Sequence, residues 1–93
     1  MATPVLFPHV MDFWLIGEAV RQRILELCRE KNISVNKLSS MSGVTQSTVN
    51  NIVSGRNHSA TVSTVKKLCD GLGISIEDFF SSVLFQDLEQ ELK

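Results

Sequence analysis

Short hydroxyl residues and glycines recur through the middle of the chain and divide it into short segments. A serine or threonine is a favoured helix N-cap, and a glycine or asparagine can adopt the left-handed conformation that closes a helix. The boundary residues of this kind are Asn32, Ser34, Gly43, Thr45, Gly55, Thr61, Gly73 and Ser75. Tyr is absent, Pro occurs twice, and β-branched residues do not alternate with polar ones. We therefore expect an all-α fold.

The apolar residues between these boundaries follow helical periodicity and predict five helices. The expected helices cover 18–31, 35–42, 46–54 and 62–72, and a fifth opens after Ser75. The residues expected to face the core are Val20, Ile24, Leu27, Cys28, Leu38, Met41, Val49, Ile52, Val53, Val62, Val65, Leu68, Cys69, Leu72, Ile76, Phe79, Phe80, Val83 and Leu84. The basic residues expected to lie off the apolar stripe of the first helix are Arg21, Arg23, Arg29 and Lys31.

A chain of 93 residues with 43% hydrophobic residues can bury one modest core, and its composition is not that of a disordered protein. We expect an apolar N-terminal extension at 1–15, a helical domain at 16–85 and an acidic tail at 86–93. Positive charge gathers in the middle of the chain, and residues 73–93 carry five acidic residues and one lysine. This division fits a protein that binds an anion with one face, but an ordinary solvated surface produces it equally often.

Sulfur and imidazole groups give no sign of a metal site. Cys28 and Cys69 fall on apolar stripes, so we interpret them as buried free thiols rather than as a disulfide or as metal ligands. His9 and His58 have no cysteine or carboxylate at ligand spacing. We therefore expect neither a metal nor any other cofactor.

The N-terminal residues are apolar but do not form a signal peptide. No Lys or Arg precedes the apolar run, and Pro4 and Pro8 interrupt it. No apolar stretch of the sequence is long enough to span a membrane. The sequence therefore predicts a cytoplasmic protein without a membrane partner.

The expected helix at 46–54 has an unusual outer face. Gln46, Ser47, Asn50, Asn51 and Ser54 lie opposite its apolar side, and none of them is charged. Exposed helix faces usually carry Glu and Lys, which favour the helix more than Ser or Asn do. Amides and hydroxyls can read base edges in the major groove of DNA, so this face is a candidate for base contact. A merely solvated polar helix is the alternative.

Two stretches of the chain, NISVNKLSSMSGVTQSTVNNIVSG and TVSTVKKLCDGLGISIEDFF, resemble the lambda-repressor-like, Cro/C1-type (XRE) family of helix-turn-helix proteins. The resemblance covers about residues 16–80. It implies a compact five-helix DNA-binding domain that acts as a transcriptional regulator, with its third helix in the major groove. It also implies a homodimer on a roughly palindromic double-stranded operator.

The resemblance assigns contacts to individual positions of this chain. The residues placed on bases are Gln46, Ser47, Asn50 and Asn51. The residues placed on the DNA backbone are Asn36, Lys37, Thr45, Arg56 and Asn57. One departure concerns Val35, because many members of the family have Gln at that position, where it grips a phosphate.

Two other classes of function were weighed against DNA regulation. A protein-interaction module, such as the antitoxin of a toxin–antitoxin pair, could use the same fold and bind a protein partner through the apolar N-terminus or the acidic tail. An enzyme is not expected, because the sequence has no paired carboxylates, no Ser–His–Asp constellation and no phosphate-binding glycine loop.

Apolar residues near both ends exceed what one small core needs, which favours a homodimer. They include Phe80, Val83, Leu84 and Leu88 at one end and Phe13 and Trp14 at the other. The alternative is that the N-terminal segment folds over the fifth helix and completes the core of a single copy.

Overall fold

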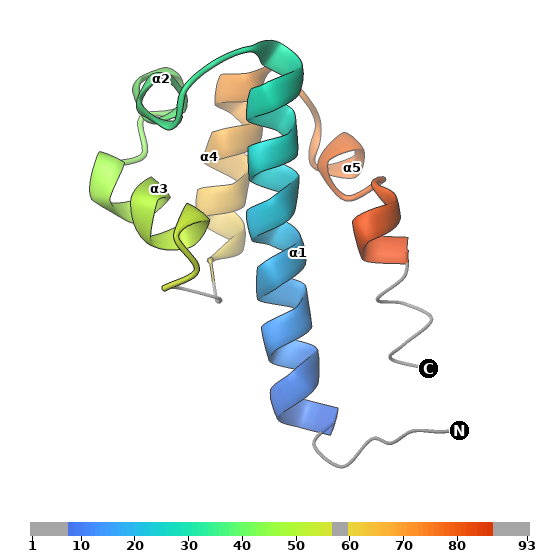
Figure 1. Cartoon of the computed structure of the whole chain (residues 1–93). Helices are drawn as coiled ribbons and strands as arrows, with labels where there is room; N and C mark the ends of the chain where they lie inside the picture. The colour runs from blue at the N-terminus through green and yellow to red at the C-terminus, as the bar shows by residue number, and fades with distance from the viewer. Residues whose placement is uncertain (1–7, 57–59, 87–93) are drawn as a thin grey trace.

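The computed structural model describes residues 8–56 and 60–86, with side chains described from residue 16 onward. The helices are α1 (Pro8–Lys31), α2 (Val35–Ser42), α3 (Gln46–Val53), α4 (Val62–Leu72) and α5 (Ile76–Phe79), and a further helical turn follows at 83–86 (Figure 1). No strand occurs in these residues. The expectation of an all-α fold is confirmed.

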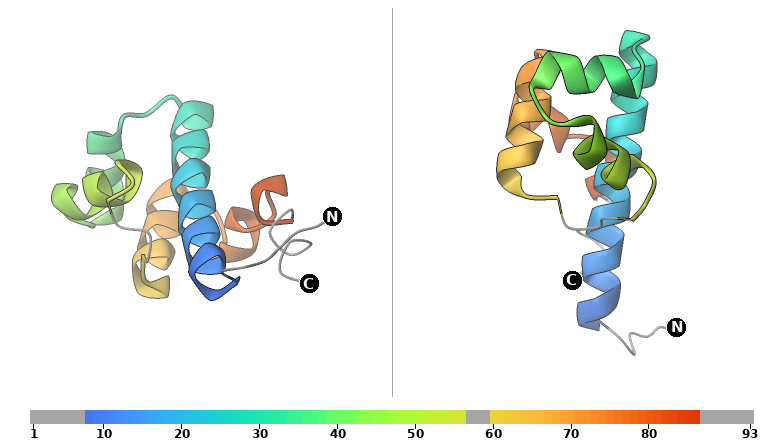
Figure 2. Two further views of the ribbon diagram at one scale, coloured as in Figure 1. Left: turned by 60° about the horizontal axis from the view of Figure 1, so that its bottom comes forward. Right: turned by 90° about the vertical axis from the view of Figure 1, so that its left-hand side faces the viewer.

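The elements are arranged around the long helix α1. Helices α2 and α3 lie on one side of α1, and α5 lies on the other (Figures 1 and 2). Helix α2 packs against α4 and α3, while α3 also packs against α1 and α5 packs against α4. This arrangement places α3 at the edge of the molecule, where one of its faces is free.

A single core lies between the helices. Its buried members are Val20, Ile24, Leu27, Cys28, Leu38, Val44, Val49, Ile52, Val65, Leu68, Cys69, Leu72 and Phe79. Both cysteines are buried and free, as predicted. The predicted core is thus confirmed for most positions of the first four helices.

In the first four helices, two residues that were expected in the core are exposed. Met41 is 41% exposed because α2 approaches α4 through Ser42, the neighbouring position, and through Leu38 one turn earlier. Val62 is 77% exposed, since it is the first residue of α4 and lies beyond the buried part of that helix. Periodicity alone therefore gave the wrong face at the end of a short helix.

The predicted helix caps are confirmed. The hydroxyls of the four N-cap residues each accept a hydrogen bond from the backbone N–H three residues later; these residues are Ser34, Thr45, Thr61 and Ser75. Gly43 and Gly73 close α2 and α4 with φ of 75° and 74°, and Asn32 follows α1 with φ of 55°. These local bonds satisfy N–H and C=O groups that every helix end leaves without a partner.

Helix α1 is longer than predicted. It begins at Pro8 rather than at Glu18, so residues 8–17 belong to the same helix. Proline suits the first turn of a helix because its missing N–H would have no partner there. The residues of the predicted acidic tail from 87 onward lie outside the described residues.

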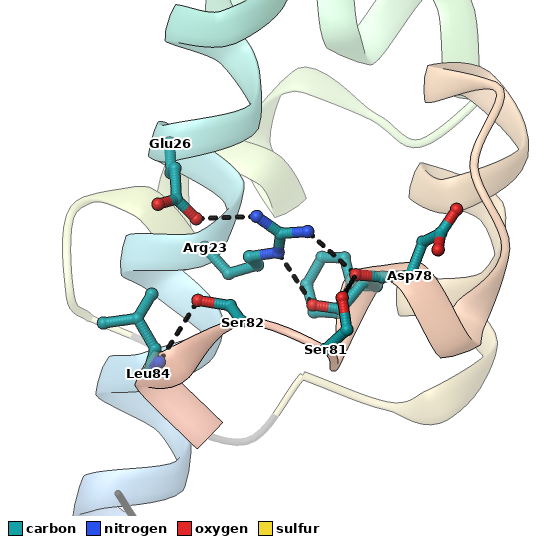
Figure 3. Close-up of polar contacts among 7 residues, drawn as sticks. Arg23, Glu26, Asp78, Ser81, Ser82 and Leu84 are labelled. Atoms are coloured by element: carbon teal, nitrogen blue, oxygen red, sulfur yellow. Dashed lines mark hydrogen bonds and ion pairs between the residues drawn. The ribbon is translucent and has the colours of Figure 1, made fainter. Parts of the chain in front are cut away.

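The predicted fifth helix is interrupted. Helix α5 ends at Phe79, and Phe80, Ser81 and Ser82 separate it from the turn at 83–86. The Ser81 hydroxyl donates to the Asp78 carbonyl at 2.8 Å, and the Ser82 hydroxyl accepts from the Leu84 N–H at 3.1 Å (Figure 3). Serine hydroxyls compete in this way with the backbone bonds of a continuous helix. As a result Phe80 and Val83, which were expected in the core, are 41% and 67% exposed. Ile76, the first residue of α5, was also expected in the core and is 36% exposed.

Candidate nucleic-acid interface

The turn between α2 and α3 is held by serine hydroxyls. The Ser39 Oγ donates to the Val44 carbonyl at 2.5 Å, and the Ser42 Oγ accepts from the Val44 N–H at 3.3 Å. Gly43 adopts the left-handed conformation between them, and the Val44 side chain is buried. The turn therefore satisfies its own polar groups and fixes α3 at one angle to α2.

Gly71 sets the distance between α2 and α4. A Cβ atom at this position would lie 2.7 Å from the Cα of Ser42, closer than real Cβ contacts allow. Glycine costs about 1 kcal/mol relative to alanine inside a helix, so its presence in α4 is explained by this close approach. The role of Gly71 could not be predicted from the sequence, because the contact joins two helices that are far apart in the chain.

Arg21 of α1 binds the C-terminal end of α3. Its Nε donates to the Val53 carbonyl at 3.0 Å, and its Nη1 contacts the Glu18 carboxylate at 2.8 Å. A cation at this end satisfies a carbonyl that lacks an intrahelical partner and interacts favourably with the helix dipole. The contact fixes the end of α3 to α1.

Arg23, two residues later, does the same for α5. Its Nε donates to the Phe79 carbonyl at 2.7 Å and its Nη2 to the Asp78 carbonyl at 2.8 Å, while Nη1 contacts Glu26 at 2.7 Å (Figure 3). The periodicity of the first helix predicts only that Arg21 and Arg23 lie off its apolar stripe. Their partners lie 32 and 56 residues away, so no local pattern could reveal them.

The exposed face of α3 brings together the four residues predicted to contact bases. Gln46, Ser47, Asn50 and Asn51 are all exposed. Within residues 8–56 and 60–86 none of these four side chains forms a hydrogen bond with another group of the protein. The opposite face of α3 is buried in the core. Helix α3 thus presents amides and a hydroxyl that remain available for a ligand.

Comparison with protein-family models gives the decisive observation. The model of the Cro/C1-type HTH DNA-binding domain matches residues 23–83, which is more than half of the chain. The chain belongs to the Cro/C1-type HTH family. The search of curated proteins returned no match, and the search of solved structures returned none either.

The matched region of this Cro/C1-type protein runs from within α1 to the start of the last helical turn, so it includes α2, α3 and the turn between them. The family resemblance inferred from the sequence is confirmed, and with it the assignment of a DNA-binding domain. Among the helices that the structure describes, none is long and apolar enough to cross a membrane.

The residues predicted to contact the DNA backbone surround α3 but are not equally available. Asn36 and Lys37 are exposed in the first turn of α2, and Arg56 is exposed just after α3. The Thr45 hydroxyl already accepts from the Thr48 N–H at 3.3 Å and lies 2.9 Å from the Thr48 hydroxyl. Asn57 lies outside the described residues.

The two cations that flank α3 in the sequence of this Cro/C1-type domain, Lys37 and Arg56, are available for an anion. In the described part of the chain, no carboxylate pairs with Lys37 or Arg56. The Arg56 Nε donates only to the Ser54 hydroxyl, at 3.2 Å. Lys66, in contrast, pairs with Asp70 along α4 at 2.5 Å. Unpaired positive charge therefore flanks α3 in sequence on both sides.

Proposed function

We propose that this protein is a transcriptional regulator that binds double-stranded DNA in a sequence-specific way, with α3 in the major groove. The observation that carries the proposal is the face of α3 formed by Gln46, Ser47, Asn50 and Asn51, which is exposed and has no partner among the described residues. Short polar side chains allow a helix to approach base edges closely, and their amides and hydroxyls match the groups displayed there. The family match supplies the class of ligand.

Contacts to phosphates fix the position of α3 on the duplex in this proposal. Lys37 and Arg56 neutralise phosphates, and Asn36 and Thr45 contribute hydrogen bonds, together with Asn57. Val35 occupies the position where many family members have a glutamine, and its side chain packs partly against the core. Asn36, the next residue in the exposed first turn of α2, takes over the polar contact at this place.

The protein acts as a homodimer on a roughly palindromic operator. A single helix-turn-helix reads only a few base pairs, so two copies are needed for useful specificity. Three apolar side chains near the C-terminal end are exposed and support a contact surface there: Ile76, Phe80 and Val83. Leu88, expected to belong to the same surface, lies outside the described residues.

The test of base reading compares binding to duplexes selected from a random library with binding to unselected duplexes. Asn51→Ala should weaken binding to the selected duplex by about 5- to 150-fold, equivalent to about 1–3 kcal/mol, and leave unselected duplexes almost unaffected. Arg56→Ala should weaken binding to both kinds of duplex alike and reduce the salt slope by about one unit. Ser63→Ala, on the exposed side of α4, is the matched control. Equal affinity of the wild type for all duplexes would refute sequence-specific regulation.

The test of assembly is sedimentation equilibrium of the wild type and of Val83→Asp. Val83 is 67% exposed, so a carboxylate should be tolerated by the folded monomer and disfavoured only in an apolar contact between copies. We expect the variant to be monomeric and to lose affinity for a whole operator more than for a half-site. A wild type that stays monomeric and binds half-sites singly would contradict the dimer.

A further inference from the structure

Most of the polar side chains on the exposed face of α3 carry the same chemical group. Three of the four side chains on this face, Gln46, Asn50 and Asn51, end in a primary amide, and the fourth is a serine. Helix α3 has the sequence QSTVNNIV and contains neither arginine nor lysine. The other hydroxyls near its N-terminus are already engaged, because Thr45 and Thr48 bond to each other at 2.9 Å. The amides are therefore the main groups available to a base pair.

An amide matches one base better than the others. Adenine presents the N7 acceptor beside the N6 amino donor in the major groove, and an amide offers a donor and an acceptor at the same spacing. Guanine presents two acceptors, N7 and O6, which are satisfied together by the paired donors of arginine or by lysine. A face with amides and no cation thus favours adenine over guanine.

The cations that flank α3 in the sequence are not placed to supply a guanine contact from α3 itself. Lys37 belongs to the first turn of α2, and Arg56 follows the left-handed Gly55 after α3 has ended. The Arg56 Nε is directed to the Ser54 hydroxyl, and the Arg56 N–H donates to the Asn51 carbonyl. Neither cation is part of α3: Lys37 belongs to α2, and Arg56 lies beside the C-terminal end of α3, next to Ser54. Cations at these places suit contacts to phosphates.

We infer that the base pairs facing α3 in each half-site are A·T pairs, read through N6 and N7 of adenine by the amides of Gln46, Asn50 and Asn51. In each contact the amide oxygen accepts from N6 and the amide nitrogen donates to N7. This inference rests on the proposed placement of α3 in the major groove.

The interface carries few positive charges, so the amide contacts with bases should contribute a large part of the binding free energy. Lys37 and Arg56 are the cations proposed to meet phosphates, so the salt slope should be only about −2 per protomer. Electrostatic attraction of that size holds DNA of any sequence weakly. Discrimination between sequences must then come from the amide contacts, which makes their base preference measurable against a low background.

The experiment uses the full chain and the duplex selected from a random library, with single adenines replaced by 7-deazaadenine. This analogue keeps the N6 amino group and base pairing but lacks the N7 acceptor. We expect affinity to fall about 3- to 10-fold at each adenine that faces α3 and to stay unchanged at flanking adenines. The variant Asn51→Ala should lose the sensitivity at one position of each half-site, whereas Ser63→Ala should keep it everywhere.

Three results would overturn the inference, and they differ in whether the proposed function would still hold. Selected half-sites with guanine at the read positions and sensitivity to 7-deazaguanine would exclude adenine reading but leave sequence-specific binding intact. A·T-rich half-sites without any sensitivity to 7-deazaadenine would indicate that the shape of the duplex is read instead of base edges. Equal affinity for all duplexes would refute the proposed function as well.

Discussion

Arg21 and Arg23 leave α1 two residues apart and bind the C-terminal ends of two different helices, α3 on one side and α5 on the other. The two contacts are not equivalent. The Arg21 side chain is 30% exposed and donates to one carbonyl, whereas the Arg23 side chain is 11% exposed and donates to two. The shorter helix, α5, is therefore capped by the arginine that is more buried and donates more hydrogen bonds.

The two helices differ in the same direction. Helix α3 has eight residues, an N-cap and two buried side chains, Val49 and Ile52. Helix α5 also has an N-cap, but it has only four residues and one buried side chain, Phe79. A single helical turn is not stable alone, because nucleating a helix fixes several residues for one hydrogen bond. The comparison indicates that α3 is maintained by packing and by its turn, while α5 depends on Arg23 and Phe79.

The largest expected effect concerns the buried anchor of α5. Phe79→Ala should lower the free energy of unfolding by about 3–5 kcal/mol, because it removes a fully buried ring from the core. Phe80→Ala is the matched control: its ring is 41% exposed and touches Phe79 edge-on, so it should cost about 1 kcal/mol. Urea denaturation measures both values. Similar losses for the two variants would show that α5 has no specific anchor.

The second prediction concerns Gly71 of α4, which lies against Ser42 of α2 and leaves no space for a side chain. Gly71→Ala should lower the free energy of unfolding by about 1–3 kcal/mol, although alanine favours the helix, because the new Cβ would collide with Ser42. The control Ser63→Ala, in an exposed position of the same helix, should change stability by a few tenths of a kcal/mol at most. A stabilised Gly71→Ala protein would mean that α2 and α4 can separate without cost.

The two arginines test the comparison directly. Arg23→Ala should cost about 2 kcal/mol and Arg21→Ala about 1 kcal/mol, since a hydrogen bond from a charged donor contributes about 1.5–3 kcal/mol and exposure reduces it. Amide exchange separates the two sites. Arg21→Ala should speed exchange of the Ser54 and Arg56 amides, which bond to carbonyls of α3, and Arg23→Ala should leave them protected. Faster exchange at α3 in both variants would show that the two caps act as one unit.

The smallest effect concerns the core that both sides share. Burial raises the pKa of the Cys28 thiol and of the Cys69 thiol above the ordinary value of 9.0, and the Asp70 carboxylate adds to the increase at Cys69. The folded chain therefore holds these protons more tightly than the unfolded chain. The contribution of the protonated thiols to stability is fully present below the ordinary thiol pKa and is lost as the pH rises through the raised pKa values.

Urea denaturation at a series of pH values from 8 upward checks this expectation, with Cys28→Ala and Cys69→Ala as comparisons. The free energy of unfolding should fall more steeply above pH 9 in the wild type than in either variant. Parallel curves for all three proteins would mean that the thiols do not titrate with unfolding.

Helix ends could be predicted from the sequence because capping is a local interaction. Ser34 and Thr45 each accept a hydrogen bond from an N–H in the first turn of the helix that they cap, α2 and α3 respectively. Gly43 closes α2 at its C-terminal end. The exposed face of α3 followed from the same local rules, and the structure confirms that its four predicted residues are exposed. Their contacts with bases stay a prediction.

Features that depend on distant partners could not be predicted in this way. Met41 is exposed because α2 packs closely against α4 through Ser42, where Gly71 has no side chain. The periodicity of α2 cannot reveal this contact. The break after Phe79 depends on the hydroxyls of Ser81 and Ser82, which form hydrogen bonds with backbone groups of nearby residues. The caps provided by Arg21 and Arg23 join segments that only the folded chain brings together.

The serine hydroxyls in the turn between α2 and α3 hold the direction of α3 before any DNA is present. In the proposed complex, loss of backbone entropy should therefore be small, and ordering should be confined to side chains such as those of Asn50 and Asn51. An encounter with DNA then requires no prior rearrangement of the protein. The association rate should accordingly be limited by diffusion and orientation, so that operators of different strength differ mainly in how long the complex lasts.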